Sequence, residues 1–313
     1  MADFSYIKRE FDPTLGRITT KWILELPGAG CQWFKKTGGC TMCGFSQATQ
    51  KYTLGGRLWP HWFFMVLFYY AYWLVRKSHP EVLVIYNGGS FLCDKEIPAK
   101  TQLAIIKFAR RHHLIQKVMV ETRAEFVSEK KLTLYRDALG DSKYLEIAIG
   151  LESADDYIRN TILGKGMSRQ IFERAIAICK EPGVLTFAYV FLKPEGLTEE
   201  EAIEDAVATI RYCHGLGVNE VALSCAFVQE GTSLCQSYRK GNFQPPKLWS
   251  VIKVVESTGL LMSVAIGGFS DEPPPIAVPS NCPDCNQVVM AAIQTYRENH
   301  QLSAFDGLQC DCK

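Results

Sequence analysis

Three cysteines in a glycine-rich loop are the first residues of the chain whose types and spacing suggest chemistry. Residues 28–47 read GAGCQWFKKTGGCTMCGFSQ, with cysteines at positions 31, 40 and 43. Thiols at this spacing are compatible with a zinc knuckle, a disulfide loop, a redox pair or an iron–sulfur cluster. The flanking glycines allow the backbone to fold closely around a bound group. We therefore expect this loop to hold a metal centre.

The number of thiols in this loop separates the two metal hypotheses. A structural zinc site usually closes with four ligands, so zinc would need a distant fourth ligand such as His61. A four-iron cluster held by three cysteines leaves one iron open to an exogenous ligand. The loop favours the cluster, and the zinc site stays open as an alternative.

Four further cysteines end the chain as two close pairs. Cys282 and Cys285 are separated by two residues, and Cys310 and Cys312 by one. Two close pairs of this kind predict a metal site. Four thiolates make a closed tetrahedral site, which favours structural zinc, with a second iron–sulfur cluster as the rival hypothesis. Residues 287–299, between the pairs, predict an amphipathic helix that packs on the preceding domain.

The composition is that of an ordinary globular protein. The chain has 313 residues, is 47% hydrophobic and carries a formal net charge of +1, which gives no sign of a basic nucleic-acid-binding face. The N-terminal residues lack the apolar core of a signal peptide. The apolar run 62–75 is shorter than the roughly 20 residues that a bilayer requires. We expect a buried or partner-binding helix there, and a cytoplasmic protein, in which disulfides are rare.

Strands and helices alternate regularly along the chain. The predicted strands are residues 21–28, 81–89, 117–123, 144–153, 184–192, 219–227 and 260–268. The predicted helices are residues 59–76, 99–113, 128–139, 168–181, 198–217 and 245–258. This repetition predicts an α/β fold with a parallel sheet, a partial or full (β/α) barrel. The expected domains are a barrel over 1–268, a proline-rich linker over 269–281 and a cysteine-rich metal-binding module over 282–313.

Polar residues follow several predicted strands. In (β/α) barrels the chemistry lies at the C-terminal ends of the strands. Cys31, the segment Asn87–Gly88–Gly89, the pair Glu121 and Arg123, and Glu152 all fall at such ends. We therefore expect them at one mouth of the barrel.

Each of these positions also has a structural interpretation. Residues 87–89 could be a tight turn, Glu121 and Arg123 a structural pair, and Glu152 a cap for the turn at 153–156. Lys165, between two glycines, and Lys193, before Pro194, are candidate functional lysines or solvated loop lysines.

The order of these motifs resembles the archaeosine synthase radical-SAM (beta) subunit family of the radical S-adenosylmethionine superfamily. In most of the superfamily, three and then two residues separate the three cysteines. In this chain eight and then two residues separate them, a spacing that resembles this family. The resemblance runs from about residue 25 to residue 312. It is carried by GCQWFKKTGGCTMCGF, GGSFLCDKEIP, VETRAEF, AIGLESADDYIRNTILGKG, YVFLKPEGLTEEEAIEDA, FQPPKLWS and NCPDC…CDC.

The resemblance implies a role for each matching position. Cys31, Cys40 and Cys43 would bind a [4Fe–4S] cluster whose open iron chelates the amino and carboxylate groups of S-adenosylmethionine. Met42 stands where relatives often carry an aromatic residue, so Phe45 would pack near the adenine. The implied cofactor-binding residues are Phe45, Asn87, Gly88, Gly89, Ser90, Glu121, Arg123 and Glu152. The implied catalytic residues are Glu121, Arg123, Lys165 and Lys193.

The implied activity is radical chemistry on a modified nucleoside. The reduced cluster would cleave S-adenosylmethionine, and the resulting radical would abstract hydrogen to break a carbon–nitrogen bond of a lysine-modified deazaguanine in tRNA. The implied partners are a flavodoxin- or ferredoxin-type electron donor, a partner enzyme and tRNA, with no membrane. One alternative is a radical enzyme acting on a free nucleobase, amino acid or other metabolite. Another is a non-catalytic, cluster-bearing subunit that presents residues 59–76 to a partner.

Overall fold

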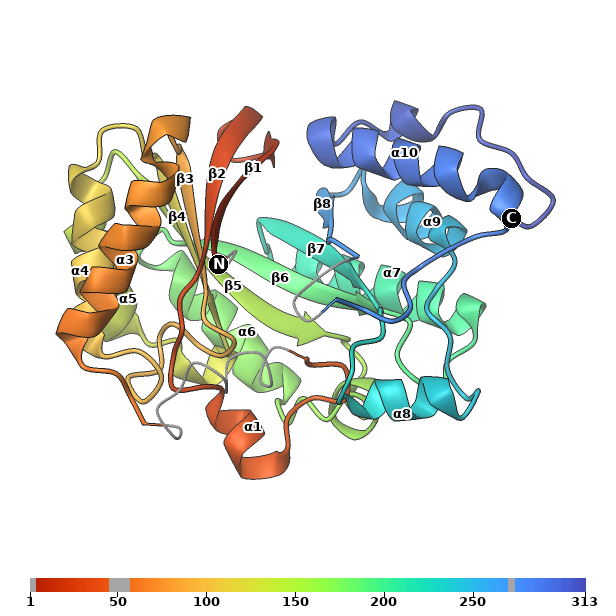
Figure 1. Cartoon of the computed structure of the whole chain (residues 1–313), viewed down its shortest axis with the longest axis horizontal. Coiled ribbons are helices and arrows are strands. Elements are labelled where there is room, and N and C mark those ends of the chain that lie inside the picture. The colour runs from red at the N-terminus through yellow and green to blue at the C-terminus, as the bar shows by residue number, and fades with distance from the viewer. Residues whose placement is uncertain (1–3, 45–56, 270–273) are drawn as a thin grey trace. The chain divides into compact units, whose positions relative to one another are not determined.

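The computed structural model of the chain describes residues 4–44, 57–269 and 274–313 (Figure 1). Within these ranges the chain forms two compact units. The first contains residues 4–39, 57–150 and 170–187, and the second contains residues 40–44, 151–169, 188–269 and 274–313. The divisions fall inside the cysteine loop, within two strands and after the first residue of the helix α6 (Arg169–Lys180). The domain boundaries expected at 268 and 282 therefore stay a prediction.

The strands are hydrogen-bonded in chain order from β1 to β8. In the first unit these are β1 (Ser5–Asp12), β2 (Arg17–Glu25), β3 (Val82–Tyr86), β4 (Lys117–Thr122) and most of β5 (Tyr144–Glu152). β2, β3, β4 and β5 pair in parallel, as the alternation of strands and helices predicts. β3 reads VLVIY and is almost entirely buried, which is typical of a strand covered on both faces.

An antiparallel edge strand was not expected. β1 pairs with β2 in a hairpin, in which Asp12 lies opposite Arg17. Because this pairing occupies residues 17–24, β2 begins four residues before the predicted start at 21. β1 carries Lys8, Arg9 and Glu10 in succession, so its sequence lacks the alternation that marks a half-buried strand.

Three helices of the first unit lie side by side, and the first of them also contacts β1 (Figure 1). They are α3 (His61–Val75), α4 (Ala99–Arg111) and α5 (Glu129–Leu139). α3 buries the stripe Phe64, Phe68, Ala71 and Val75, whereas Trp62 and Trp73 on its other side are 66% and 57% exposed. The expectation of a buried helix is therefore right for one face only. No helix in the described ranges is both long and apolar enough to cross a bilayer.

The second unit is built around three strands and four α-helices among its described residues. It contains the end of β6 (Leu185–Leu192), β7 (Glu220–Cys225) and β8 (Ser263–Ile266), with β7 and β8 parallel. The helices are α7 (Glu199–Gly215), α8 (Ser233–Arg239), α9 (Leu248–Thr258) and α10 (Pro283–Asn299). The α10 helix confirms the helix predicted between the two C-terminal cysteine pairs. Tyr296 of α10 donates a hydrogen bond to the Val264 carbonyl of β8, 2.8 Å away.

The starts of the helices show which of the residues there form capping hydrogen bonds. Thr198 and Glu201 form a capping box at the start of α7. Ser128 occupies the N-cap position of α5, but its side chain makes no capping hydrogen bond. Pro245 and Pro246 precede α9 rather than open it, because the helix starts at Leu248. α6 (Arg169–Lys180) lies within the range predicted for it.

A buried ionic triad joins β1, β4 and β5. Lys117 Nζ lies 3.0 Å from Asp12 Oδ2 and 2.9 Å from Glu146 Oε2, and all three side chains are at most 2% exposed. Burial raises the pKa of Glu146, and the Lys117 ammonium opposes that shift. The ammonium is shared by two carboxylates, so its loss would leave both without this counter-charge.

We predict that Lys117→Ala destabilises the protein strongly. Because two buried carboxylates lose their shared cation, the free energy of unfolding should fall by about 3–5 kcal/mol. The measurement is urea denaturation followed by circular dichroism. Arg239→Ala, which breaks an exposed ion pair with Glu230, is the control and should cost at most about 1 kcal/mol. Equal effects from the two substitutions would contradict this interpretation.

Candidate functional site

Hydrogen bonds tie the segment after β3 to the end of β4 in the first unit. The Arg123 N–H donates to Ser90 Oγ at 3.1 Å, and the Phe91 N–H donates to the Glu121 carbonyl at 2.8 Å. Ser90 is fully buried, and Glu121 is half-buried. The predicted cofactor-binding residues Ser90, Glu121 and Arg123 are thus brought together by one hydrogen bond to the Ser90 side chain and one between backbone groups.

A buried glutamate ties the same segment to the cysteine loop. Glu96 is fully buried, and its Oε1 accepts a hydrogen bond from the Gln32 N–H at 3.0 Å. Its Oε2 accepts from the Ser90 N–H at 2.5 Å and faces the Asn87 amide nitrogen at 3.5 Å. Burial raises the pKa of Glu96, and the hydrogen bonds from Gln32 and Ser90 oppose that shift. The loop that starts with Cys31 is therefore anchored to the segment after β3.

Close packing explains the glycine at position 89. A methyl group added there would lie 2.0 Å from Glu96 Oε2 and 3.2 Å from the Cys31 Cα. Gly88 has a φ of +61°, so the segment also makes the turn that its alternative interpretation predicts. The Asn87 side chain is buried, and its Oδ1 has no hydrogen-bond partner. A buried acceptor of this kind calls for a partner, which a bound ligand can supply.

Arg123 reaches back to the helix that follows Cys31. That helix, α1, spans Gln32–Thr37, and the Arg123 guanidinium lies 5.0 Å from the centre of the Trp33 ring. Arg123 also forms an ion pair with Glu125. Burial raises the pKa of the Cys31 thiol. A metal ion or cluster would favour the thiolate that burial alone disfavours.

The other two loop cysteines belong to the second unit. Cys40 and Cys43 are half-buried, and the Cys43 N–H donates to the Cys40 carbonyl at 3.1 Å. Between them, the Thr41 N–H donates a hydrogen bond to the Leu163 carbonyl. The Thr41 carbonyl accepts one from the Leu234 N–H. Met42 packs on a buried apolar cluster that includes Leu163. The helix α8, which the sequence did not predict, therefore supports the cysteine loop through Leu234.

Glu152 and Lys165 form a buried ion pair in the second unit. Lys165 Nζ lies 2.7 Å from Glu152 Oε1, and Lys165 is flanked by glycines with φ values of +65° and +60°. The solvated interpretation of Lys165 is therefore wrong. Glu152 itself has a φ of +70°, a strained conformation for a residue with a side chain. The turn at 153–156 is capped by Ser153 Oγ and Asp155 rather than by Glu152.

Lys193 has a strained, positive-φ backbone conformation like that of Glu152. Its φ is +74°, its Nζ donates to the Leu197 carbonyl, and Glu199 lies 3.7 Å away. Its side chain is 12% exposed, so the surface interpretation is wrong here too. Two non-glycine residues with positive φ at the ends of β5 and β6 indicate local constraint of the kind found at functional sites.

The four C-terminal cysteines converge on one point of the second unit. The sulfur atoms of Cys282, Cys285, Cys310 and Cys312 all lie within 4.8 Å of one another. Three of the Sγ–Sγ distances are 3.5–3.6 Å. Trp249 of α9 donates from Nε1 to Cys312 Sγ at 3.4 Å. A backbone hydrogen bond from Cys282 contributes most to lowering the pKa of the Cys312 thiol to about 6.

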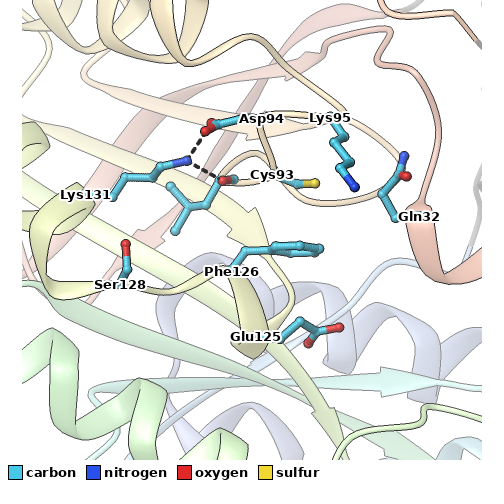
Figure 2. A pocket seen from close by; sticks show the side chains of 9 residues that line it. Gln32, Cys93, Asp94, Lys95, Glu125, Phe126, Ser128 and Lys131 are labelled. Carbon is cyan, nitrogen blue, oxygen red and sulfur yellow. Dashed lines mark hydrogen bonds and ion pairs between the residues drawn. The ribbon is translucent and has the colours of Figure 1, made fainter.

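A cavity of about 500 Å³ borders the first-unit residues (Figure 2). It is lined by Gln32, which follows Cys31, and by Glu125, which pairs with Arg123. Figure 2 shows Lys131 directed at Asp94, to which it is bonded at 2.6 Å. Burial raises the pKa of the lining thiol, Cys93, to about 11, so Cys93 stays protonated near neutral pH.

Sequence reasoning missed Glu96 and left two predictions unanswered. Glu96 stands beside Asp94 and Lys95 in a charged stretch, and no feature of its residue type separates it from them. Its donors are backbone N–H groups, which residue types do not reveal. Phe45, the predicted adenine contact, lies outside the described residues. His61, the proposed fourth zinc ligand, lies 3.0 Å from the Thr101 hydroxyl.

Comparisons with known proteins identify the family. No family model matches the chain. The archaeosine synthase subunit beta of Methanosarcina acetivorans is 31% identical over 308 residues, which cover 95% of this chain and 84% of that protein. The subunit of the same name from Thermococcus kodakarensis is 25% identical, over 96% of this chain and 92% of that protein.

Solved structures identify the fold. The archaeal Elp3 of Methanocaldococcus infernus has a TM-score of 0.55 at 18% identity, over 78% of this chain and 59% of that one. A radical SAM methyltransferase from Sphaerobacter thermophilus has a TM-score of 0.53 at 12% identity, over 84% of this chain and 77% of that one. These similarities confirm the predicted α/β fold of the radical SAM type. The chain belongs to the archaeosine synthase subunit beta family.

Proposed function

We propose that the protein cleaves a carbon–nitrogen bond in a lysine-modified deazaguanine of tRNA, using S-adenosylmethionine as the radical source. The observation that carries this proposal is the 31% identity to an archaeosine synthase subunit beta over 95% of the chain. The word subunit in that name also supports a partner protein. A flavodoxin- or ferredoxin-type electron donor is part of the same proposal.

The donor set of the cysteine loop fits a cluster with one open iron. Cys31, Cys40 and Cys43 would hold a [4Fe–4S] cluster, since all three are half-buried thiols in a loop rich in glycine. When bound, the cluster supplies the electron that cleaves S-adenosylmethionine into methionine and a 5′-deoxyadenosyl radical. The protein's own contribution is to hold, orient and shield these groups from water.

The segment after β3 is the candidate site for the methionine part of S-adenosylmethionine. Asn87 Oδ1 is buried without a hydrogen-bond partner, and an amino group would satisfy it. Gly88, Gly89 and Ser90 would bring the backbone close to the same group. Arg123 is held by Ser90 and Trp33 and would act as a fixed positive charge near the carboxylate.

The second unit supplies the candidate substrate contacts. Glu152 and Lys165 form a buried ion pair, and Lys193 shares the positive φ of Glu152. We propose that the Lys165 ammonium, 2.7 Å from Glu152 Oε1, holds the Glu152 carboxylate in a fixed position. Lys193 is held by Leu197 and Glu199 and would present its charge in a fixed position.

The four C-terminal cysteines are proposed to bind a single zinc ion. A tetrahedral site with Zn–S bonds of about 2.3 Å has Sγ atoms about 3.8 Å apart. A four-iron cluster would separate its cysteine sulfurs more widely, by roughly 6 Å. The spacings of 3.5–3.6 Å and the upper limit of 4.8 Å support the mononuclear site. The zinc would then fasten the end of the chain to α9 through Trp249 and Cys312.

The first prediction of this proposal is a coupled pair of products. Anaerobically reconstituted protein, given a reductant, S-adenosylmethionine and lysine-modified tRNA, should form 5′-deoxyadenosine and a nucleoside whose mass matches carbon–nitrogen cleavage. Chromatography with mass spectrometry measures both. Cys40→Ser should lose both products, because the cluster loses a ligand.

The control for this experiment is Cys213→Ala, which changes a buried thiol of α7 that belongs to none of the proposed ligand sets. It should keep its iron and both products. Formation of 5′-deoxyadenosine without tRNA turnover, but with turnover of a free nucleobase or amino acid, would support the small-molecule alternative. No 5′-deoxyadenosine with any substrate would favour a non-catalytic subunit.

The second prediction concerns metal content. Elemental analysis of the reconstituted protein should find about one zinc and about four irons per chain. Cys285→Ser should lose the zinc and keep the iron, whereas Cys40→Ser should lose the iron and keep the zinc. Because structural zinc contributes directly to folding, Cys285→Ser should also lower the melting temperature. A wild-type protein with about eight irons and no zinc would contradict the zinc assignment.

A further inference from the structure

We propose that Glu96 is a positioning residue that holds the first cysteine of the cluster loop against the segment that binds S-adenosylmethionine. This inference rests on the proposed function, since it gives the carboxylate a purpose in assembling that site. Glu96 lies within the stretch GGSFLCDKEIP, but the resemblance implied no role for it, and it belongs to none of the predicted cysteine, lysine or glycine groups. Only its hydrogen bonds in the structure indicate this role.

The two carboxylate oxygens serve different segments. Oε1 accepts from the Gln32 N–H at 3.0 Å, one residue after Cys31. Oε2 accepts from the Ser90 N–H at 2.5 Å and faces the Asn87 amide at 3.5 Å. Because Gln32 and Ser90 are 58 residues apart in the sequence, this one side chain fixes the distance between two loops that share no covalent restraint.

The main chain of Glu96 reinforces the same junction. The Ala29 N–H donates to the Glu96 carbonyl at 3.1 Å, and the Glu96 N–H donates to the Cys93 carbonyl at 2.9 Å. A methyl group on Gly28 would lie 3.2 Å from the Glu96 carbonyl oxygen. The glutamate is thus fixed at both its backbone and its side chain, with one glycine from each loop packed against it.

The chemistry of the junction requires a carboxylate. Its donors are backbone N–H groups on both sides, so both oxygens must accept hydrogen bonds. A glutamine at this position would keep one acceptor oxygen and replace the other with an NH₂ group. That NH₂ group would face a backbone N–H, so one hydrogen bond would be lost and two donors would point at each other. Since both oxygens are already engaged, Glu96 is suited to hold the two loops rather than to react with the cofactor.

The effect of Glu96 extends to the end of β4. Ser90, which donates to Glu96, accepts from the Arg123 N–H at 3.1 Å. The Arg123 side chain lies over Trp33, the neighbour of Gln32. Glu96, Ser90, Arg123 and the start of α1 therefore form a closed ring of contacts, and loss of the carboxylate opens it at two places.

Glu96→Gln tests the proposal against a matched control. Glu146→Gln makes the same change at another fully buried carboxylate, in the ionic triad, which contacts none of the proposed cofactor residues. Three quantities are measured for each: melting temperature, iron per chain after anaerobic reconstitution, and the dissociation constant for S-adenosylmethionine. Glu96→Gln should bind less iron and weaken S-adenosylmethionine binding by about tenfold or more. Glu146→Gln should lower only the melting temperature.

Each outcome decides a separate question. Wild-type levels of iron and of S-adenosylmethionine binding in Glu96→Gln would overturn the positioning role while leaving the proposed function intact. Failure of the wild-type protein itself to take up iron or S-adenosylmethionine would overturn the proposed function. If Glu96→Gln does not fold, Glu96→Asp is measured in its place. If both fail to fold while Glu146→Gln folds, the carboxylate serves the fold alone and the positioning role is wrong.

Discussion

The carboxylate of Glu96 is the contact on which the first-unit site depends. Three segments that follow neighbouring parallel strands have no covalent reason to keep a fixed spacing. Glu96 binds the N–H of Gln32 after β2 and that of Ser90 after β3, and Ser90 in turn binds the N–H of Arg123 after β4. Strand order alone brings such segments to one edge of a sheet. The buried carboxylate then sets their separation at hydrogen-bond distance.

Buried charged residues have different roles at the two ends of the strands in the first-unit sheet. Lys117 is the first residue of β4, and it joins Glu146 near the start of β5 to Asp12 at the end of the antiparallel β1. That triad lies where polar groups in (β/α) folds serve stability. Glu96, Ser90 and Arg123 lie at the opposite ends of the strands, where chemistry is found. The strained backbones of Glu152 and Lys193, at the ends of β5 and β6, follow the same rule.

The repeating part of the fold could be predicted from the sequence, because its signals are periodic. Seven strands and six helices were expected, and each has a counterpart near its expected range. β1 was missed because three consecutive charged residues break its alternation. The short α1 and α8, of 6 and 7 residues, are too brief for a helical period to emerge. The convergence of the four C-terminal cysteines was predictable, because two close pairs of cysteines in a sequence indicate a metal site.

The chemistry of individual contacts was less predictable. Residue types placed Asn87, Arg123 and Glu152 at strand ends, but they could not show that Lys165 is buried against Glu152. The role of Glu96 could not be predicted because its two closest donors are backbone N–H groups 64 and 6 residues away in the sequence. A carboxylate that binds side chains leaves a charge pattern, whereas one that binds the backbone leaves none.

The central claim is that three cysteines leave one iron open for S-adenosylmethionine. Electron–nuclear double resonance on the reduced, reconstituted protein tests it most directly, with S-adenosylmethionine carrying ¹⁵N in its amino group. We expect a ¹⁵N coupling to the cluster in the wild-type protein that disappears without the labelled compound. A cluster signal that is unchanged by S-adenosylmethionine and shows no nitrogen coupling would contradict it.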